Sequence, residues 1–482
     1  MRALSLMEAM TGAFAEHGAR PLFESEQGEV VSYGEVLALA PPSLGSELAR
    51  RLVFCLCDND IGGLAGYFHL LSVNAVPLML AANLPSQQLQ PLLDAYRPAF
   101  IWLPAARRAE FPEATALFAY RDYCLIAQEE ADYRVHDELA LLLSTSGSTG
   151  SPKFVRLSQR NVLSNAMAIA QYLELDADEV PITTLAPSYT YGLSILHSHA
   201  LAGSKIAVSR KTFLERGFWG FLQAVRASSF GGVPYHYEML RKLRFTGMEL
   251  PSLRTLTQAG GRMAPELSRE FALHCQSRGM RFFTMYGQTE ATARMSYLSA
   301  DKAALKAGSI GAAVPGGEFW LEDERGERLD GAEAEGELVY QGPNVSMGYA
   351  CGFGDLASGD ERQGVLRTGD VAHRDSDGDY YIVGRLKRFL KLFGHRINLQ
   401  EVEQYLLDAG HVAACAGVDD RLEVYVPQGD AALAKEIKIM LARYLTVTPQ
   451  SVKVMTGGDL PRNASGKILY SELTPQAWGA QA

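Results

Sequence analysis

Short apolar runs alternate with longer amphipathic stretches from about Leu52 to Met285. The apolar runs are typical of buried strands, and the stretches between them carry apolar residues at helical spacing. We therefore expect βαβ units around a largely parallel sheet, because strands that alternate with helices usually pair in this way. The predicted strands are Leu52–Cys57, Ala99–Leu103, Leu139–Ser144, Lys205–Ser209, Ser229–Val233, Thr255–Gln258 and Phe282–Met285, and the predicted helices include Gln159–Leu173, Phe213–Ala227 and Pro265–Ser277.

The pattern changes after Gly308, where short strand-like segments are separated by Gly, Asn and Asp turns. This texture indicates a small antiparallel or barrel-like unit. Its predicted strands are Phe319–Glu322, Gly336–Gln341 and Asp379–Val383.

A final α+β section follows Gly384-Arg385, with predicted helices near Leu399–Asp408 and Ala432–Tyr444 and strands within Cys415–Val426. The predicted fold class is α/β. A large N-terminal domain of mostly parallel α/β sheets carries the barrel-like unit, and a small, mobile α+β C-terminal domain follows. We expect the domains to be residues 1–386 and 387–482.

Length and composition fit a globular protein of more than one domain. A chain of 482 residues exceeds one ordinary hydrophobic core. The net charge of −10 disfavours general binding to nucleic acid or to a membrane surface. The six cysteines show neither zinc-site spacing nor a disulfide framework. With no signal-peptide pattern and no apolar run of transmembrane length, we expect a cytoplasmic protein.

The most informative stretch is residues 144–153, which read Ser-Thr-Ser-Gly-Ser-Thr-Gly-Ser-Pro-Lys. Backbone N–H groups, hydroxyls and one ammonium at this density suit a polyphosphate. No acidic residue occurs between Glu138 and Glu174, whereas three basic ones do, and in an acidic chain this gap favours an anion site. The basic residues are Lys153, Arg156 and Arg160.

Two other interpretations of this stretch are weaker. A flexible Ser/Gly linker is disfavoured because apolar periodic segments flank the loop closely on both sides. A Walker P-loop requires Gly-Lys-Ser/Thr after four spacer residues, and here Pro152 precedes Lys153.

Each of three further motifs also has an ordinary structural interpretation when it is taken alone. Tyr286-Gly287-Gln288-Thr289-Glu290 follows a predicted strand and could stack a base, hold a phosphate oxygen and bind Mg²⁺ through Glu290. Asp370, at the end of Arg367-Thr368-Gly369-Asp370, suits vicinal ribose hydroxyls but is also an ordinary turn residue. Lys467 follows a Ser-Gly turn, where a lysine is usually plain surface.

Together and in this order, the motifs resemble the adenylate-forming superfamily, which contains acyl-CoA synthetases, adenylation domains of nonribosomal peptide synthetases, and luciferases. The resemblance runs from about Tyr33 to Leu473. Gly260-Gly261-Arg262 is similar to the glycine pair that lies against adenine, and Gly336–Tyr349 to the Gly-Glu-Leu … Gly-Tyr segment.

The resemblance assigns a role to each motif residue. The catalytic residues would be Lys467, Thr289 and Glu290, with Glu290 also holding the metal. Lys387 falls on the hinge, and Gly394 and His395 on the thiol-acceptor side. The ATP or AMP residues would be Thr145, Ser146, Gly147, Ser148, Thr149, Gly150, Lys153, Gly260, Gly261, Arg262, Tyr286, Gly287, Gln288, Asp370 and Arg385.

The resemblance implies a two-step reaction. A carboxylate attacks the α-phosphate of MgATP to give an acyl-adenylate and pyrophosphate, and then a thiol attacks the adenylate after the C-terminal domain rotates about Lys387. No general base is needed for the first step, because a carboxylate is already ionised at neutral pH. The cofactors would be ATP and Mg²⁺, with CoA or the phosphopantetheine of a carrier protein as acceptor.

The acyl pocket departs from the family pattern. Tyr189 stands where the family usually has His, and no Asp lies between Pro181 and Arg210 to hold an α-ammonium group, so we expect a non-amino acid. Arg294 could face inward and pair with a second substrate carboxylate, although a solvated loop arginine is the favoured interpretation. The expected lining residues are Tyr189, Tyr191, Gly192, Val233, Tyr235 and Arg294.

The acceptor and two alternative functions stay open. Basic residues at 387–396 could meet the phosphates of CoA or an acidic carrier protein, which would be a separate partner. A catalytically degenerate nucleotide-binding protein is one alternative, disfavoured by intact Lys467 and Glu290. Oxidative, luciferase-like use of the adenylate is the other. We expect neither a nucleic-acid partner nor a membrane span.

Overall fold

The computed structural model describes residues 4–128, 133–145, 153–331, 334–392, 395–445, 447–462, 468–474 and 478. Several side chains between 387 and 396, Lys387 and His395 among them, fall outside this description. The chain divides into two compact units: Met1–Phe319 with Tyr340–Leu366, and Trp320–Val339 with Arg367–Ala482.

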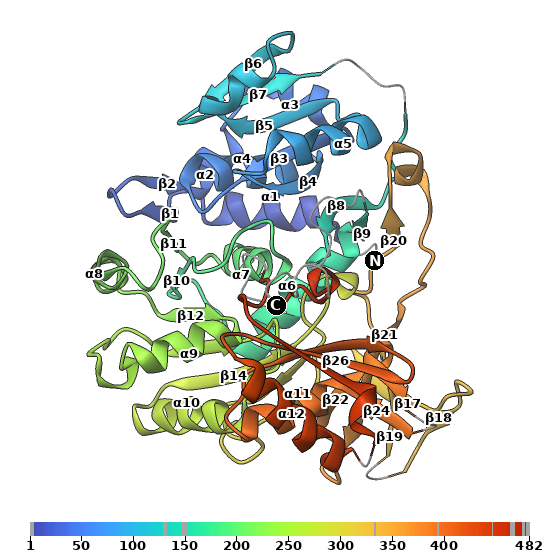
Figure 1. Ribbon diagram of the computed structural model, residues 1–482. Helices are drawn as coiled ribbons and strands as arrows, with labels where there is room; N and C mark the ends of the chain where they lie inside the picture. Colours follow the sequence, from blue (N-terminus) through green and yellow to red (C-terminus); the bar gives the residue numbers. More distant parts are fainter. Residues whose placement is uncertain are drawn as a thin grey trace. The chain divides into compact units, whose positions relative to one another are not determined.

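The first unit contains two large sheets, and most of their strands are labelled in Figure 1. One sheet has the order β16-β15-β14-β13-β12-β10-β11-β1-β2. Its centre is parallel, because β12, β13 and β14 pair in the same direction. Its strands are β16 (Ala312–Ala313), β15 (Ser296–Leu298), β14 (Arg281–Tyr286), β13 (Thr255–Gln258), β12 (Ser229–Gly232), β10 (Pro181–Ile182), β11 (Ile206–Val208), β1 (Pro21–Ser25) and β2 (Val30–Ser32).

The other large sheet has the order β20-β9-β8-β4-β3-β5-β7-β6. Strands β3, β4, β5 and β8 are parallel, and the outer strands are antiparallel. Its strands are β20 (Gly348–Ala350), β9 (Phe154–Ser158), β8 (Leu139–Ser144), β4 (Val76–Ala81), β3 (Leu52–Cys57), β5 (Phe100–Pro104), β7 (Tyr123–Ala127) and β6 (Thr115–Tyr120).

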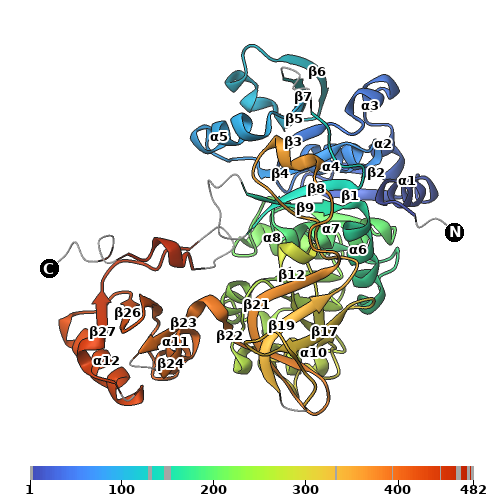
Figure 2. The same cartoon turned by 90° about the vertical axis from the view of Figure 1, so that its right-hand side faces the viewer.

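Helices α6 and α7 lie between these two sheets in both views (Figures 1 and 2). Helix α6 begins where predicted, because the Ser158 side chain accepts a hydrogen bond from the Asn161 N–H in a capping box. The helices of this unit are α1 (Leu6–Glu16), α2 (Tyr33–Leu37), α3 (Pro42–Leu48), α4 (Ile61–Ser72), α5 (Ser86–Tyr96), α6 (Gln159–Leu173), α7 (Thr190–Leu201), α8 (Arg216–Ala224), α9 (Pro234–Lys242) and α10 (Pro265–Ser277).

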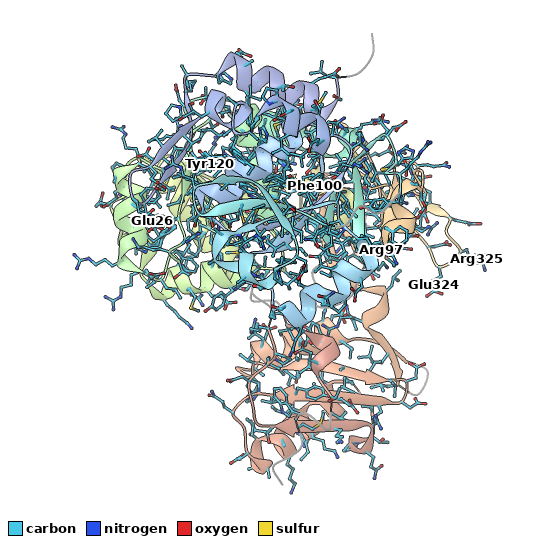
Figure 3. All side chains as sticks on the ribbon, turned by 90° about the horizontal axis from the view of Figure 1, so that it is seen from above. Glu26, Arg97, Phe100, Tyr120, Glu324 and Arg325 are labelled. Carbon is cyan, nitrogen blue, oxygen red and sulfur yellow. The ribbon has the colours of Figure 1, made fainter. Side chains whose placement is uncertain are left out.

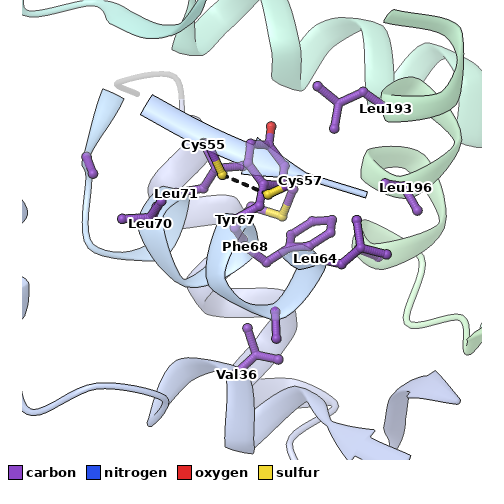
Figure 4. Close-up of a cluster of buried hydrophobic side chains, with 14 of the residues drawn as sticks. Val36, Cys55, Cys57, Leu64, Tyr67, Phe68, Leu70, Leu71, Leu193 and Leu196 are labelled. Atoms are coloured by element: carbon purple, nitrogen blue, oxygen red, sulfur yellow. Dashed lines mark hydrogen bonds between the residues drawn. The ribbon is translucent and has the colours of Figure 1, made fainter. Parts of the chain in front are cut away.

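The core of the first unit joins α4 and α7 to the strands (Figure 4). Leu193 and Leu196 of α7 pack in one buried cluster with Phe68 of α4 and with Cys55 and Cys57 of β3. Both sides of β3 are buried, as expected for a central parallel strand. Arg97, labelled in Figure 3, is the C-cap residue of α5 and has a left-handed backbone conformation. Its guanidinium group lies over the Phe353 ring.

The second unit carries the antiparallel strands expected after Gly308. They form a sheet of order β18-β17-β19-β21-β22, with strands β18 (Arg328–Leu329), β17 (Glu318–Glu322), β19 (Glu335–Gln341), β21 (Val365–Arg374) and β22 (Tyr380–Arg385). The α+β section has α11 (Leu399–Asp408), α12 (Ala431–Tyr444), β23 (Phe389–Leu392), β24 (His395–Asn398), β25 (Ala414–Val418), β26 (Arg421–Val426) and β27 (Val452–Thr456).

The predicted fold class is confirmed: a large α/β sheet region is followed by a smaller α+β region. Helix α8 is shorter than the predicted Phe213–Ala227 at both ends, because it begins at Arg216, after the N-cap residue Glu215, and ends at Ala224. No helix within the described part of the chain is long and apolar enough to cross a membrane.

Candidate active site

The motifs predicted to bind the nucleotide follow neighbouring strand ends. Gly260 and Gly261 come shortly after β13, and Tyr286–Glu290 begins at the last residue of β14. Strands β13 and β14 pair in parallel, with Gln258 opposite Thr284. Both motifs therefore leave the same edge of the sheet, where open α/β sheets bind ligands.

Position 260 requires a glycine because the side chains of Tyr189 and Val233 lie close to its backbone. Gly260 has φ +83°, and a Cβ there would lie 2.3 Å from the Tyr189 hydroxyl oxygen and 3.1 Å from Val233. The Gln258 side-chain amide donates to the Gly261 carbonyl oxygen at 3.0 Å, which holds the turn. Gly260, Gly261 and Arg262 are exposed, so this backbone edge is open to a ligand.

Lys153 and Glu290 both contact Tyr349. The Tyr349 hydroxyl donates to Glu290 Oε1 at 2.8 Å. Lys153 Nζ lies 3.6 Å from the centroid of the Tyr349 ring. Strand β20 brings this tyrosine there by pairing Tyr349 with Val155 of β9. The lysine that ends the Ser/Gly-rich loop and the carboxylate expected to hold the metal thus share one aromatic partner.

Tyr349 keeps its proton near neutral pH. Burial, and then the Glu290 carboxylate beside it, raise the pKa of the Tyr349 hydroxyl to about 12. It therefore serves as a hydrogen-bond donor to Glu290. We missed this residue in the sequence, although the Gly-Tyr at 348–349 lies inside a segment that matches the family motif.

The remaining residues of this motif lie in the same turn. Thr289 is buried at the start of a 3₁₀ helix, Thr289–Ala291, and the Gln288 side-chain amide donates to the Tyr286 hydroxyl at 3.2 Å. Gly287 permits a close backbone approach, because a Cβ there would lie 1.7 Å from the Ala293 carbonyl oxygen.

Asn344 holds the segment that follows Glu290. The side-chain amide of Asn344 donates to the main-chain carbonyl oxygens of Ala291 at 3.0 Å and Arg294 at 3.1 Å. The main-chain carbonyl oxygen of Asn344 accepts a hydrogen bond from Thr292 Oγ1 at 2.7 Å. Thr292 has φ +66° and ψ −62°. Such a conformation is costly for a β-branched residue, and it persists because the surrounding hydrogen bonds fix it.

Arg294 is buried, so the favoured interpretation of a solvated loop arginine is wrong. Its side chain is 2% exposed, and Nη1 donates to the Tyr172 hydroxyl at 2.9 Å. The guanidinium carbon lies 5.0 Å from the centroid of the Tyr191 ring.

The other expected lining residues differ in burial. The Tyr191 hydroxyl contacts the Thr257 Oγ1 at 2.8 Å, and Val233 is buried. Gly192 lines a small cavity beside β10. Tyr189 is half-buried, whereas Tyr235, on α9, is 38% exposed.

Arg156 does not contribute to a free anion site, contrary to the expectation from the charge gap. It is fully buried and donates to the carbonyl oxygens of Tyr349, at 2.9 Å, and Ser358, and it pairs with Glu361. Of the three basic residues in that window, Lys153 and Arg160 are exposed.

Within the second unit, Asp370 and Arg385 lie together. Asp370 is 2% exposed, and its Oδ1 lies 2.7 Å from Arg385 Nε, across the β21–β22 pair. Arg388 is also paired internally, because Nη2 donates to Glu403 Oε1 at 2.7 Å and its guanidinium carbon lies 3.7 Å from the centroid of the Tyr470 ring. Arg388 is therefore already engaged and is not a free cation for a partner.

Several predicted residues lie outside the described part of the chain. Thr145 and Lys153 are described, and Ser144 of β8 pairs with Phe154 of the antiparallel strand β9. The backbones of Lys387 and His395 are described, without their side chains. The residues that lie outside are Ser146, Gly147, Ser148, Thr149, Gly150, Gly394 and Lys467.

Comparison with known proteins agrees with the motifs. Residues 43–350 match the AMP-binding enzyme family. A feruloyl-CoA synthase of Amycolatopsis sp is 31% identical over 352 residues, which cover 70% of each chain. The 4-coumarate–CoA ligase 3 of Oryza sativa subsp. japonica is 27% identical and matches over 98% of this chain and 92% of its own.

The fold resembles a solved structure over almost the whole chain. The o-succinylbenzoate CoA synthetase (MenE) of Bacillus subtilis, in complex with the acyl-adenylate intermediate OSB-AMP, matches with a TM-score of 0.78 at 21% identity. The match covers 98% of this chain and 99% of that one. The fold and the motifs are thus those of adenylate-forming enzymes. The chain belongs to the AMP-binding enzyme family.

Proposed function

We propose that this protein activates a carboxylic acid with ATP to an acyl-adenylate, releases pyrophosphate, and transfers the acyl group to a thiol. The observation that supports this most is the meeting of Lys153 and Glu290 on Tyr349. A cation from the phosphate loop and a fixed carboxylate at the strand edge are what a metal-bound polyphosphate requires.

The residues fit a magnesium ion. Mg²⁺ is usually bound through one or two carboxylates together with substrate phosphates, and Glu290 offers one carboxylate that Tyr349 orients. When bound, the ion would neutralise phosphate charge. Adenine would lie against the open backbone at Gly260 and Gly261, and Asp370 would hold the ribose hydroxyls.

The first step is opposed mainly by repulsion between two anions, the acid and the phosphates. Preorganised positive charge and backbone donors therefore supply most of the rate enhancement. We propose that Lys467 bridges the substrate carboxylate and the α-phosphate, and that Thr289 contacts the α-phosphate. The carboxylate oxygen forms a bond to phosphorus while the bond to pyrophosphate breaks.

For the second step, we propose a C-terminal domain of residues 387–482 that turns about Lys387 and brings Gly394 and His395 to the adenylate. The thiol sulfur then attacks the acyl carbon, and AMP leaves. The relatives reported above are named for CoA, so CoA is the acceptor we propose, and a separate carrier protein is the alternative.

The substrate is proposed to be a non-amino carboxylic acid. No Asp lies between Pro181 and Arg210 in the sequence to pair with an ammonium group, and Arg294 puts a positive charge beside Tyr191 instead. The burial of an unpaired ammonium beside a cation would be doubly unfavourable.

The test is ATP–pyrophosphate exchange with a panel of fatty, aryl, hydroxy and amino acids. At least one non-amino acid should support exchange, and Glu290→Gln should slow it and raise the Mg²⁺ concentration needed. Glu270→Gln, which removes an exposed carboxylate on α10, is the matched control and should behave as the parent. No exchange with any acid would favour a degenerate nucleotide-binding protein, and an α-amino acid as the best substrate would refute the proposed substrate class.

A further inference from the structure

Among the described residues of the first unit, two arginines have buried side chains, and they differ in their partners. Arg156 pairs with Glu361 and donates to the carbonyl oxygens of Tyr349, Ser358 and Gly359. Its charge is thus compensated inside the protein. Arg294, which is 2% exposed, has no such set of partners.

The partners of Arg294 are weak acceptors. Nη1 donates to the Tyr172 hydroxyl at 2.9 Å and to Met285 Sδ at 3.1 Å, and Nε has no hydrogen-bond partner. The Tyr191 ring contributes a cation–π contact. Among the described residues, no carboxylate lies within ion-pair distance of this guanidinium. Burial of an unpaired charge is unfavourable, and an arginine cannot become neutral by losing its proton. The charge of Arg294 therefore stays uncompensated.

The main chain of Arg294 is fixed on both sides. Asn165 of α6 donates to its carbonyl oxygen at 2.7 Å and accepts from its N–H at 3.3 Å. A Cβ on Gly287 would lie 2.8 Å from the Arg294 Cα, so the Tyr-Gly-x-Thr-Glu turn packs directly against this residue. The charge is therefore held rigidly beside the site that carries Glu290.

The neighbouring groups leave this positive charge in place. His199 has an unpartnered Nε2, and burial, and to a lesser degree the charge of Arg294, lower its pKa to about 4, so it is neutral near pH 7. Burial raises the pKa of the Tyr172 hydroxyl, and burial likewise raises that of Tyr191. Neither phenol ionises at neutral pH to balance the guanidinium.

We propose that Arg294 binds a second carboxylate of the substrate, so that the acid activated by this enzyme is a dicarboxylic acid. One carboxylate reacts at the α-phosphate, and the other completes the ion pair that the protein leaves open. The proposal rests on the proposed function and specifies its substrate class. A guanidinium that lacks an internal carboxylate favours an anion over a neutral group of the same size.

The first experiment uses the unaltered enzyme. ATP–pyrophosphate exchange is measured with aliphatic and aromatic dicarboxylic acids of graded length, each beside its own monoamide, which has the same shape and one charge fewer. We expect at least one diacid to exceed its monoamide in kcat/KM by roughly 30-fold or more, the range for a desolvated charge pair. If monoamides or plain monocarboxylic acids support exchange with a kcat/KM equal to that of every diacid, the inference is overturned while the proposed function stands.

The second experiment locates the preference. Arg294→Met is expected to lower kcat/KM for the best diacid by roughly 30- to 1,000-fold and to leave its monoamide within a few-fold of the parent. The KM for MgATP should not change. Arg294→Lys keeps the charge but lacks the planar guanidinium group. Its kcat/KM for the diacid should lie between those of the parent and Arg294→Met. Arg269→Gln, which alters an exposed arginine on α10, is the control.

The outcomes separate the two hypotheses. Equal losses for the diacid and the monoamide in Arg294→Met would indicate a structural role for Arg294 and overturn the inference. If Arg294→Met does not fold, the parent enzyme and Arg294→Lys decide together. Absence of a diacid preference in the parent enzyme overturns the inference, and so does a preference that Arg294→Lys leaves unchanged. Exchange with no acid at all would overturn the proposed function, and the inference with it.

Discussion

The hydroxyl of Tyr349 donates a 2.8 Å hydrogen bond to Glu290, which lies 59 positions earlier in the chain. The ring of the same tyrosine lies 3.6 Å from Lys153 Nζ. The hydroxyl of this side chain thus orients the proposed metal ligand, and its ring contacts the lysine at the end of the proposed phosphate loop.

The two functions of Tyr349 can be separated by substitution. Tyr349→Phe keeps the ring under Lys153 and removes the hydrogen bond to Glu290. We expect pyrophosphate exchange to fall roughly tenfold, the value of one hydrogen bond to a charged group, with a higher Mg²⁺ requirement. Tyr349→Leu should cost more, because it also removes the cation–π contact. An unchanged Mg²⁺ titration in Tyr349→Phe would show that Glu290 needs no such positioning.

Acid should destabilise the first unit through its buried histidines. Burial lowers the pKa of His197 to about 3 and those of His199 and His236 to about 4. The unfolded chain binds these protons at about pH 6.5, so the unfolded state gains protons first as the pH falls and the free energy of unfolding decreases. At pH 5.5 each histidine should cost about 1.4 kcal/mol relative to pH 7.5 or above.

Urea unfolding at pH 7.5 and 5.5 measures this effect. In His197→Gln, the free energy of unfolding should depend less steeply on pH between about pH 6.5 and 4. The decrease in slope should correspond to one titrating proton. The control is His411→Gln, which alters a half-exposed histidine. Equal stability of the parent protein at both pH values would mean that these imidazoles are protonated in the folded state as well.

Local sequence predicted the frame of the fold well. The bounds of α6, α10, β8 and β13 are those expected, because apolar runs and caps such as Ser158 act over a few neighbouring residues. What local patterns could not give is the environment of individual charges. Arg156 and Arg294 look alike in the sequence, and both are buried by segments far away in the chain.

The same limit applies to the site. Glu290 could be recognised from its motif, but its contact with Tyr349 depends on the pairing of β20 with β9, which no local pattern determines. The surroundings of Arg294 likewise come from α6 and α7, through Asn165, Tyr172 and Tyr191. Whether a charged side chain is solvated depends on tertiary packing, and this packing is difficult to predict from a single sequence.

Lys467 should act in only one of the two half-reactions. If it contacts the substrate carboxylate during adenylation, Lys467→Ala should slow pyrophosphate exchange by roughly 10²- to 10³-fold, the effect of losing one charge-stabilising contact. Thioester formation from supplied acyl-adenylate should survive much better. Lys453→Ala, at an exposed position of β27, serves as the control. Equal losses in both half-reactions would contradict the assignment.

The last prediction concerns the hinge proposed at Lys387. Its backbone lies in a short 3₁₀ helix, Leu386–Arg388, directly after β22. A hinge absorbs a change of backbone dihedrals over a few residues, and proline fixes its own φ and restricts the residue before it. Lys387→Pro should therefore hold the protein in one domain arrangement.

The adenylating arrangement is the one we expect to be held, because the free enzyme must bind ATP first. Pyrophosphate exchange should then persist in Lys387→Pro while thioester formation collapses. Lys387→Ala, which removes the side chain but leaves the backbone free, should retain both half-reactions and is the matched control. Thioester formation by Lys387→Pro at the parental rate would mean that both steps occur without a rotation at this position, and the two-arrangement mechanism would be wrong for this enzyme.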